Sequence, residues 1–305
     1  MSHPIFRAMN VPISSTCTLG GEWRRSSAPS NHRGMALIAV LWLVAALSVM
    51  VASLSAGVRQ EAKTLADRRD LVAAQAVGDA VLQLMLQKLR AADRVPDRWT
   101  QASVTYEGRT MVAQITPLTG FIDPNRADLA LLTRLLFVAG GLAPNEAVAL
   151  AQTIIDARQQ RDSKGGLMRF EAPEDLLKVP GLHYDLYARL APLITLDGRG
   201  SSKVNANAAP VPVLLVLANG DRRVVEMIHA KRLSGEAGID MSGLDAGLTD
   251  NSYSTRVNVT AFVPLGSGKS VLVSRNVDVM TPTADGTPWS TYSLSTSIQA
   301  TASEN

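Results

Sequence analysis

The feature that most constrains the fold is a run without any charged side chain from Gly34 to Val58. Its apolar core, from Met35 to Ala56, is 22 residues long. About 20 apolar helical residues are enough to cross a bilayer. The sequence therefore predicts one membrane-spanning helix near the N-terminus and places the bulk of the chain on one side of a membrane.

This apolar run has three interpretations. A secretory signal peptide usually has a shorter apolar region of about 7–15 residues and a small-residue cleavage site after it, which Ser53–Ala56 could supply. A plain signal anchor would keep its N-terminus in the cytoplasm, because Arg24, Arg25 and Arg33 precede the run. The third interpretation is a helix that is cut on the N-terminal side of the run, and it depends on the flanking residues.

The flanks favour one long helix. Arg33-Gly34 directly precedes Met35, and there is no proline between Pro29 and Pro96. A helical period continues after the apolar run, with apolar residues spaced for one face at Val77, Ala80, Val81 and Leu84, adjoined by Met85 and Leu89. We expect a helix from about Met35 to Ala91, with the first half in lipid and the second on a soluble domain. Gly57 and Gly78 are its expected weak points, each costing about 1 kcal/mol relative to alanine.

The charge distribution argues against a strongly basic nucleic-acid-binding protein, and the cysteine content excludes a fold stabilised by intrachain disulfides. The formal net charge is +3, but residues 1–34 hold four arginines against one glutamate, while the remainder has 26 basic and 26 acidic residues. The part after Gly34 therefore has no overall field to attract a phosphate backbone. Cys17 is the only cysteine, so no intrachain disulfide can form.

Catalytic signals are sparse. After Gly34 the only histidines are His183 and His229, and there is no cysteine. The sequence has no nucleophile elbow, zinc-ligand cluster or phosphate loop. We predict that the protein is not an enzyme, and we interpret His229 as a residue on a helix surface rather than a catalytic base.

The rest of the chain predicts an α+β arrangement. A hairpin is expected over 103–115 with its turn at 107–109, and a helical region over 126–196. Within that region one helix should run from about Pro144 to Gln159, a loop should follow over 161–166, and a further helix should begin at Glu174–Leu177. A further helical pair follows, in which Asn207 caps a helix with Pro210 in its first turn and Asn219-Gly220 makes the next turn. Residues 255–263 and 270–280 alternate as strands do, and Gly266-Ser267-Gly268 is the expected turn between them. We expect an all-helical domain inserted between strands of one antiparallel sheet, and a loose tail over 281–305.

The N-terminal layout resembles that of type IV pilin-like proteins. In that family a prepilin peptidase cuts after a glycine on the cytoplasmic side and methylates the new N-terminus. The resemblance makes Gly34 the last leader residue and Met35 the first mature, methylated residue. The family's usual glutamate at the fifth mature position is replaced here by Ala39. A leader of 34 residues is long for the family, and either Met1 or Met9 could be the start.

Several stretches resemble one branch, the GspK family of minor pseudopilins of type II secretion systems. They are "RGMALIAVLWLVAALSVM", "LTGFIDPNRADLALLTRLL" with Asn125 in the family position, "AVALAQTIIDARQQRD", "PEDLLKVPGLHYDLYARLAPLITL" and "VNANAAPVPVLLVL". The chain departs from the family where an Asp-Trp-Arg-Asp stretch reads Asp156-Ala157-Arg158-Gln159. The resemblance covers about Gly34 to Met280.

This resemblance implies a pilin-like fold and a domain order. The expected parts are a cleaved leader over 1–34, an N-terminal helix over 35–91, the first part of the sheet over 92–120, the helical insert over 121–235, the rest of the sheet over 236–280, and the tail over 281–305. It implies an inner-membrane protein with a periplasmic C-terminal domain that caps the tip of a pseudopilus. Its implied partners are GspI- and GspJ-type minor pseudopilins, the prepilin peptidase and the inner-membrane assembly platform, with secreted substrates and the outer-membrane secretin as further candidates.

Two alternatives concern ligands. "LLKVPGL" resembles a DNA-binding helix-hairpin-helix, and a membrane-anchored DNA-binding protein is the second interpretation; it requires a basic face around Lys178, Arg222, Arg223, Lys231 and Arg232. The family resemblance also allows calcium in the soluble part. Its candidate oxygen ligands are Asp156, Asp162, Glu171, Glu174 and Asp175, whose spacing matches no EF-hand.

Overall fold

The computed structural model describes residues 32–92, 95–160, 169–196, 201–236, 238–265 and 268–300, with the side chains of 32–34 and 52–58 outside the description. The chain divides into two units, Met1–Lys63 and Thr64–Asn305.

Helix α1 spans His32–Ala91 and is 60 residues long. It ends at the predicted residue and begins three residues before the predicted start at Met35. Within the first unit its described apolar side chains are exposed, with Met35 73% and Trp42 71% accessible. The predicted leader over 1–34 lies outside the described residues, apart from the backbone of 32–34.

The second unit contains a five-stranded antiparallel sheet in the order β1-β2-β5-β6-β7. Strands β2 and β5 pair directly although residues 118–255 separate them in sequence. The strand bounds are β1 Thr100–Tyr106, β2 Arg109–Pro117, β5 Arg256–Leu265, β6 Lys269–Asp278 and β7 Ser290–Ala300. A mainly helical segment therefore lies between two neighbouring strands of one sheet. The prediction that this insert is all-helical is wrong, because Val204–Asn205 and Thr249–Asp250 pair as the short parallel strands β3 and β4.

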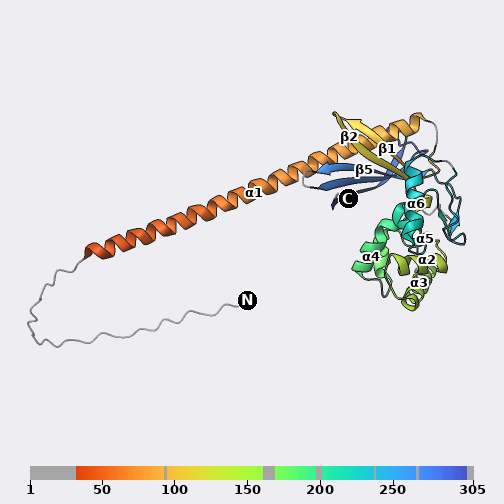
Figure 1. Cartoon of the computed structure of the whole chain (residues 1–305), viewed down its shortest axis with the longest axis horizontal. Helices are drawn as coiled ribbons and strands as arrows, with labels where there is room; N and C mark the ends of the chain where they lie inside the picture. Colours follow the sequence, from red (N-terminus) through yellow and green to blue (C-terminus); the bar gives the residue numbers. More distant parts are fainter. Residues whose placement is uncertain are drawn as a thin grey trace, which may run out of the picture. The chain divides into compact units, whose positions relative to one another are not determined.

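The second half of α1 covers one face of this sheet, as the orange-yellow part of the helix beside β1, β2 and β5 shows (Figure 1). The strands bury alternate residues against it, such as Val257, Val259 and Ala261 of β5. The core side of α1 is formed by Ala74, Val81, Leu82, Met85 and Leu86. The predicted apolar face is therefore confirmed at Val81 and Met85, while Val77, Leu84 and Leu89 lie at its margin.

The inserted domain has its own hydrophobic core. Its elements are η1 Leu118–Gly120, α2 Leu129–Val138, α3 Pro144–Gln159, η2 Pro173–Lys178, α4 Tyr184–Leu190, η3 Ala191–Leu193, β3 Val204–Asn205, α5 Val211–Leu217, α6 Arg222–Leu233 and β4 Thr249–Asp250. Figure 1 shows α2, α3 and α4 grouped together at one end of the second unit, with α5 and α6 beside them. Helix α3 begins and ends where the sequence predicts.

Local sequence signals explain several boundaries. The hairpin between β1 and β2 turns on Glu107 and Gly108, both at positive φ, as a two-residue turn of primed type requires. The Asp128 side chain accepts a hydrogen bond from the Leu131 N–H and caps α2. Asn219 and Gly220 also have positive φ, and they turn the chain from α5 into α6 as predicted. The predicted loop at 161–166 and the turn residues Gly266 and Ser267 lie outside the described residues.

Residues 281–305 were predicted to be a loose tail, and this prediction is wrong for much of the segment. Ser290–Ala300 forms β7, which pairs with the whole of β6. Trp289, directly before it, is only 6% accessible. The strand was missed because the segment is rich in serine and threonine, although Tyr292, Leu294 and Ile298 alternate with polar residues. All residues of this edge strand after Ser290 are exposed.

Three further predictions need correction. Residues 236–250 belong to the insert and not to the sheet, because Leu244 and Leu248 lie in the insert core and β4 pairs with β3. Asn207 does not cap a helix; the N-cap of α5 is Pro210, without a side-chain hydrogen bond. The segment at Glu174–Leu177 is a 3-10 helix, since Pro180 two residues after its end leaves no room for a longer helix.

Candidate functional site

The first candidate site is the contact between α1 and the sheet. A Cβ built on Gly78 would overlap the side chain of Val273 on β6, and would also lie 3.4 Å from a methyl group of Val263. The next residue, Asp79, accepts a hydrogen bond from Arg275 of the same strand and forms an ion pair with it. Gly78 is thus not simply a weak point of the helix, because its missing side chain allows α1 to lie close to Val273 of the sheet.

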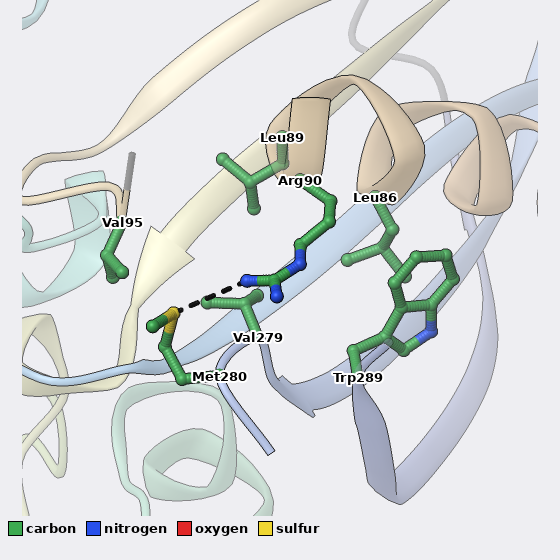
Figure 2. Close-up of a pocket in the computed structure, with 7 residues that line it drawn as sticks. All are labelled: Leu86, Leu89, Arg90, Val95, Val279, Met280 and Trp289. Atoms are coloured by element: carbon green, nitrogen blue, oxygen red, sulfur yellow. Dashed lines mark hydrogen bonds between the residues drawn. The ribbon is translucent and has the colours of Figure 1, made fainter. Parts of the chain in front are cut away.

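A small apolar pocket marks the end of α1. Leu86, Leu89 and Arg90 of the helix line it together with Val95, Val279, Met280 and Trp289. Figure 2 shows the Arg90 guanidinium directed at Met280, with a hydrogen bond of 3.6 Å to the sulfur, and the Trp289 ring beside Leu86. The two ends of the connection between β6 and β7 therefore lie against the C-terminal end of α1.

The second candidate site is the junction between sheet and insert, and Asn205 organises it. Its Oδ1 accepts from the Asn207 N–H at 3.0 Å, and its Nδ2 donates to the Ser252 carbonyl at 2.9 Å and the Asp97 carbonyl at 3.4 Å. The Trp99 N–H donates to the Asn207 carbonyl at 2.9 Å. The stretch "VNANAAP" therefore ties the start of β1 to the insert through one buried amide.

Gly120 belongs to the same junction. A Cβ there would collide with the Ala208 carbonyl and lie 2.7 Å from the Ala209 nitrogen. Only glycine lets η1, which directly follows β2, pass this close to the turn that Asn205 organises. The backbone of Gly120 therefore packs directly against the backbone of Ala208 and Ala209.

Asn125 acts as a clamp within the insert. Its Nδ2 donates to the Phe170 carbonyl and its Oδ1 accepts from the Phe170 N–H, both at 2.9 Å. Arg158 supports the same region by donating to the Pro124 and Ala127 carbonyls at 2.7 and 2.8 Å. Burial lowers the pKa of Arg158 despite the attraction of Asp123 and Asp128. The roles of Asn125 and Arg158 are structural.

A cation and two aromatic rings meet at the junction. Arg232 of α6 donates to the Ala206 carbonyl at 2.5 Å and the Ala209 carbonyl at 2.7 Å, and its guanidinium carbon lies 6.0 Å from the Trp99 ring centroid. Burial lowers the pKa of Arg232 to about 10. The His229 ring meets Trp99 edge to face, with ring centroids 5.3 Å apart.

His229 was predicted to lie on a helix surface. In the structure it is half-buried at this junction. Its Nδ1 is buried and has no hydrogen-bond partner among the described residues. Burial and, to a smaller extent, the charge of Arg232 lower the pKa of His229. A neutral imidazole against Trp99 fits a packing role.

A cleft of about 770 Å³ opens beside this junction. Its walls come from the start of β1, the end of α6 and the segment around Ser252, and they include Gln101, Asn207, Leu233 and Tyr253. The charged residues along it are engaged with neighbours, as in the ion pair of Arg98 with Asp97 at 3.0 Å. The cleft presents mainly amide, hydroxyl and apolar groups.

The four described carboxylates that were considered for calcium do not converge on one site. No group of three His, Cys, Asp or Glu side chains converges within the described ranges, and Asp162 lies outside them. Asp175 accepts from the Glu171 and Ala172 N–H groups and from Lys178, and these bonds lower its pKa to about 2.

Asp156 and Glu174 also accept hydrogen bonds from nearby side chains. Asp156 accepts from Gln152, and Glu174 accepts from the Tyr187 hydroxyl at 3.2 Å. Burial and Glu174 together raise the pKa of Tyr187 to about 12. The described carboxylates act as helix caps and surface partners, so they do not fit a calcium site.

The basic residues named for DNA binding are mostly engaged. Lys178 pairs with Asp175 at 2.7 Å, Lys231 pairs with Glu236 at 3.3 Å, and Arg232 is directed into the junction. Arg222 and Arg223 are exposed at the start of α6. The basic face that the DNA-binding interpretation requires is not formed by these five residues together.

The predicted processing residues fall at the start of the described chain. Gly34 lies in the first turn of α1 with its surroundings outside the description, while Met35 and Ala39 are exposed on the helix. Across the part of the chain that the structure describes, no helix is both long enough and apolar enough to span a membrane. The predicted span includes Ala52–Ala56, whose side chains lie outside that part, and it stays a prediction.

No family model matches the chain, and no curated protein matches its sequence.

Proposed function

We propose that this protein is a minor pseudopilin of the GspK type, which caps the tip of a periplasmic pseudopilus in a type II secretion system. The observation that carries the proposal is the order of elements in the second unit. A long helix lies on an antiparallel sheet, and a helical domain with its own core enters between β2 and β5, which still pair with each other. The N-terminal residues "RGMALIAV" supply the expected processing site.

Two features would place the chain at the tip of a filament: the size of the inserted domain and the absence of a carboxylate at Ala39. The insert adds a second hydrophobic core at the end of the sheet, too large for another subunit to stack over. Ala39 stands where the family has a glutamate that meets the N-terminal amine of a neighbouring subunit. An unpaired carboxylate in lipid is costly, so a subunit with no neighbour beyond it is more stable with alanine at this position.

The proposal names partners and a location. The chain would wait in the inner membrane with a cytoplasmic N-terminus, be processed by the prepilin peptidase, and assemble with GspI- and GspJ-type minor pseudopilins on the inner-membrane platform. Its role is structural and not enzymatic. The second candidate, a membrane-anchored DNA-binding protein, is not favoured, because Lys178, Lys231 and Arg232 are already engaged.

The test is the variant Gly34→Ala in the host cell. We expect it to block removal of the leader and to stop secretion, because the peptidase requires glycine before the cut. Gly57→Ala is the matched control, since it changes a glycine on the other side of the apolar run, and it should mature normally. Normal maturation of Gly34→Ala would remove the peptidase from the account.

A further inference from the structure

Strand β1 forms one edge of the five-stranded sheet, so it is paired on one side only, with β2. The two-residue turn at 107–108 makes the pair of Tyr106 with Arg109 a hydrogen-bonded one. Hydrogen-bonded pairs alternate along an antiparallel ladder, so every second residue of β1 directs its main-chain N–H and C=O groups away from β2. These residues are Gln101, Ser103 and Thr105.

The outward main-chain groups of β1 are open to a partner strand. The three residues that carry them are all exposed, and none of them takes part in the backbone hydrogen bonds that the described residues make outside helices and strands. Edge strands usually contain a charge, a proline or a bulge that prevents further pairing. The stretch "TQASVTY" has no charged residue and no proline, and its register with β2 has no shift.

The opposite edge strand, β7, is less suited to the same role. Its register with β6 shifts between Asn276 and Val277, and such an irregularity disrupts the ladder locally. The surroundings also differ, because the cleft of about 770 Å³ borders β1, while none of its described lining residues belongs to β7. Strand β1 therefore combines an open edge with an adjoining cleft.

The cleft begins where β1 begins. Thr100 and Gln101 are the only residues of the five-stranded sheet among the described residues that line it, and the other walls come from 97–99, the insert and 251–253. Because β2 contributes nothing to this lining, the cleft lies on the side of β1 that β2 leaves open. Its volume falls within the range of about 300–1,000 Å³ that is usual for ligand pockets.

Apolar side chains are exposed on the walls of the cleft. Leu233 is 54% and Tyr253 is 58% accessible, while Ile239 and Met241 are half-buried beside them. An apolar or aromatic side chain placed in the cleft would remove this surface from water, which is favourable in proportion to the area covered.

The charged residues of the cleft already have partners. Asp97 pairs with Arg98 at 3.0 Å. Glu236 pairs with Lys231 at 3.3 Å, and Arg232 donates to two carbonyl groups. A charged group that entered the cleft would lose its water without gaining an unpaired opposite charge. The cleft therefore favours an uncharged side chain.

We propose that β1 and this cleft bind an extended peptide segment of another protein. The peptide adds to the sheet antiparallel to β1, which is the more stable arrangement per residue, and places an apolar or aromatic side chain in the cleft. Because β1 starts at the cleft, the C-terminal end of an antiparallel peptide reaches it. Main-chain hydrogen bonds supply the affinity, and the cleft supplies the specificity.

The first test uses a phage-displayed library of random nine-residue peptides, selected against the purified full chain in detergent. We expect the enriched peptides to share an apolar or aromatic residue in their C-terminal third. No enrichment over detergent alone, or enriched peptides without that residue, would overturn the proposal. Leader processing and secretion play no part in this measurement, so its result is independent of the proposed function.

Hydrogen exchange at single-residue resolution then locates the enriched peptide after it has been synthesised. In the unbound chain the amides of Gln101, Ser103 and Thr105 should exchange rapidly, while those of Ala102 and Val104 are protected by β2. Saturating peptide should slow exchange at the first three amides at least tenfold and leave the other two unchanged. Unchanged exchange at the three outward amides would show that the peptide does not extend the sheet at β1.

Ser103→Pro removes one outward donor and should weaken peptide binding about tenfold. Thr296→Pro is the matched control, because continuing the alternation of hydrogen-bonded pairs across the sheet places the Thr296 N–H on the outer edge of β7. Equal affinities of the two variants would contradict binding at β1.

A change in the peptide alone gives a test that no folding defect of the chain can affect. N-methylation of alternate residues removes the donors on one side of an extended peptide, and N-methylation of the intervening residues removes those on the other side. We expect one of these two peptides to lose binding at least tenfold and the other to keep it. Equal binding by both would show that the peptide is not held as a strand.

Discussion

Gly78 of α1 and Val273 of β6 touch so closely that no side chain fits at position 78. At this point the helix and the sheet are in close contact, and the ion pair between Asp79 and Arg275 joins the same two elements beside it. The buried side chains Val81 and Met85 complete the contact of α1 with the sheet.

Gly78→Ala tests the close approach. In an isolated helix this change would stabilise by about 1 kcal/mol, but here we expect it to lower the free energy of unfolding by about 1–3 kcal/mol, because the new methyl group overlaps Val273. The measurement is urea unfolding of the purified chain in detergent. Ala76→Gly, at an exposed position of the same helix, reports helix propensity alone. A stabilised Gly78→Ala variant would contradict the contact.

Asn125 offers a graded test of the clamp on Phe170. Asn125→Ala removes both hydrogen bonds and should lower the free energy of unfolding by about 1–3 kcal/mol. Asn125→Asp keeps the acceptor for the Phe170 N–H but loses the donor, so it should fall between the wild type and the alanine variant. Hydrogen exchange at the Phe170 amide should become faster with alanine and less so with aspartate. Equal exchange rates in all three proteins would show that the clamp does not hold this segment.

Arg232 should be intolerant even of lysine. A lysine cannot donate to the Ala206 and Ala209 carbonyls in the same fork, and we expect Arg232→Lys to cost about 2 kcal/mol in unfolding experiments. Arg222→Lys, an exposed position of the same helix, should cost less than about 0.5 kcal/mol. Similar costs for the two variants would mean that Arg232 does not tie α6 to the junction.

We expect the free energy of unfolding to depend on pH through His229. Its folded-state pKa lies below the ordinary value of 6.5, so the folded chain binds its proton less readily than the unfolded chain. The contribution of His229 is fully present above pH 6.5 and is lost as the pH falls through the lower folded-state pKa. We expect the melting temperature to drop on acidification from pH 7 towards pH 5, and His229→Gln to reduce that drop. An unchanged pH dependence in His229→Gln would assign the drop to other groups.

Much of the fold could be predicted because strong local signals agree with the tertiary structure. Pro144 starts α3, Asn219-Gly220 turns the chain into α6, and the alternation in 255–263 marks a buried strand. The helical period of 77–89 located the face of α1 that meets the sheet. At each of these places, one residue type is required by backbone geometry or by burial.

The missed features depend on contacts between distant segments. The residues of strand β7 after Ser290 are all exposed, and its serine- and threonine-rich sequence resembles a tail, so its pairing with β6 is the evidence that defines it. Gly78 looks unfavourable in the sequence of a helix, and its reason is Val273, almost 200 residues later. Asn205, not the predicted Asn207, organises its turn because it also reaches the Ser252 carbonyl. His229 was read from its helix alone, and its place beside Trp99 comes from the docking of the sheet on the insert.

As a pseudopilin, the chain should lose its leader and keep the apolar helix. Intact-mass and N-terminal analysis of the chain extracted from host membranes measures where the mature protein begins. We expect a mature protein that begins with a methylated Met35. A protein that begins after Ala56, or one that still contains Cys17, would show that the chain is not processed as a pseudopilin.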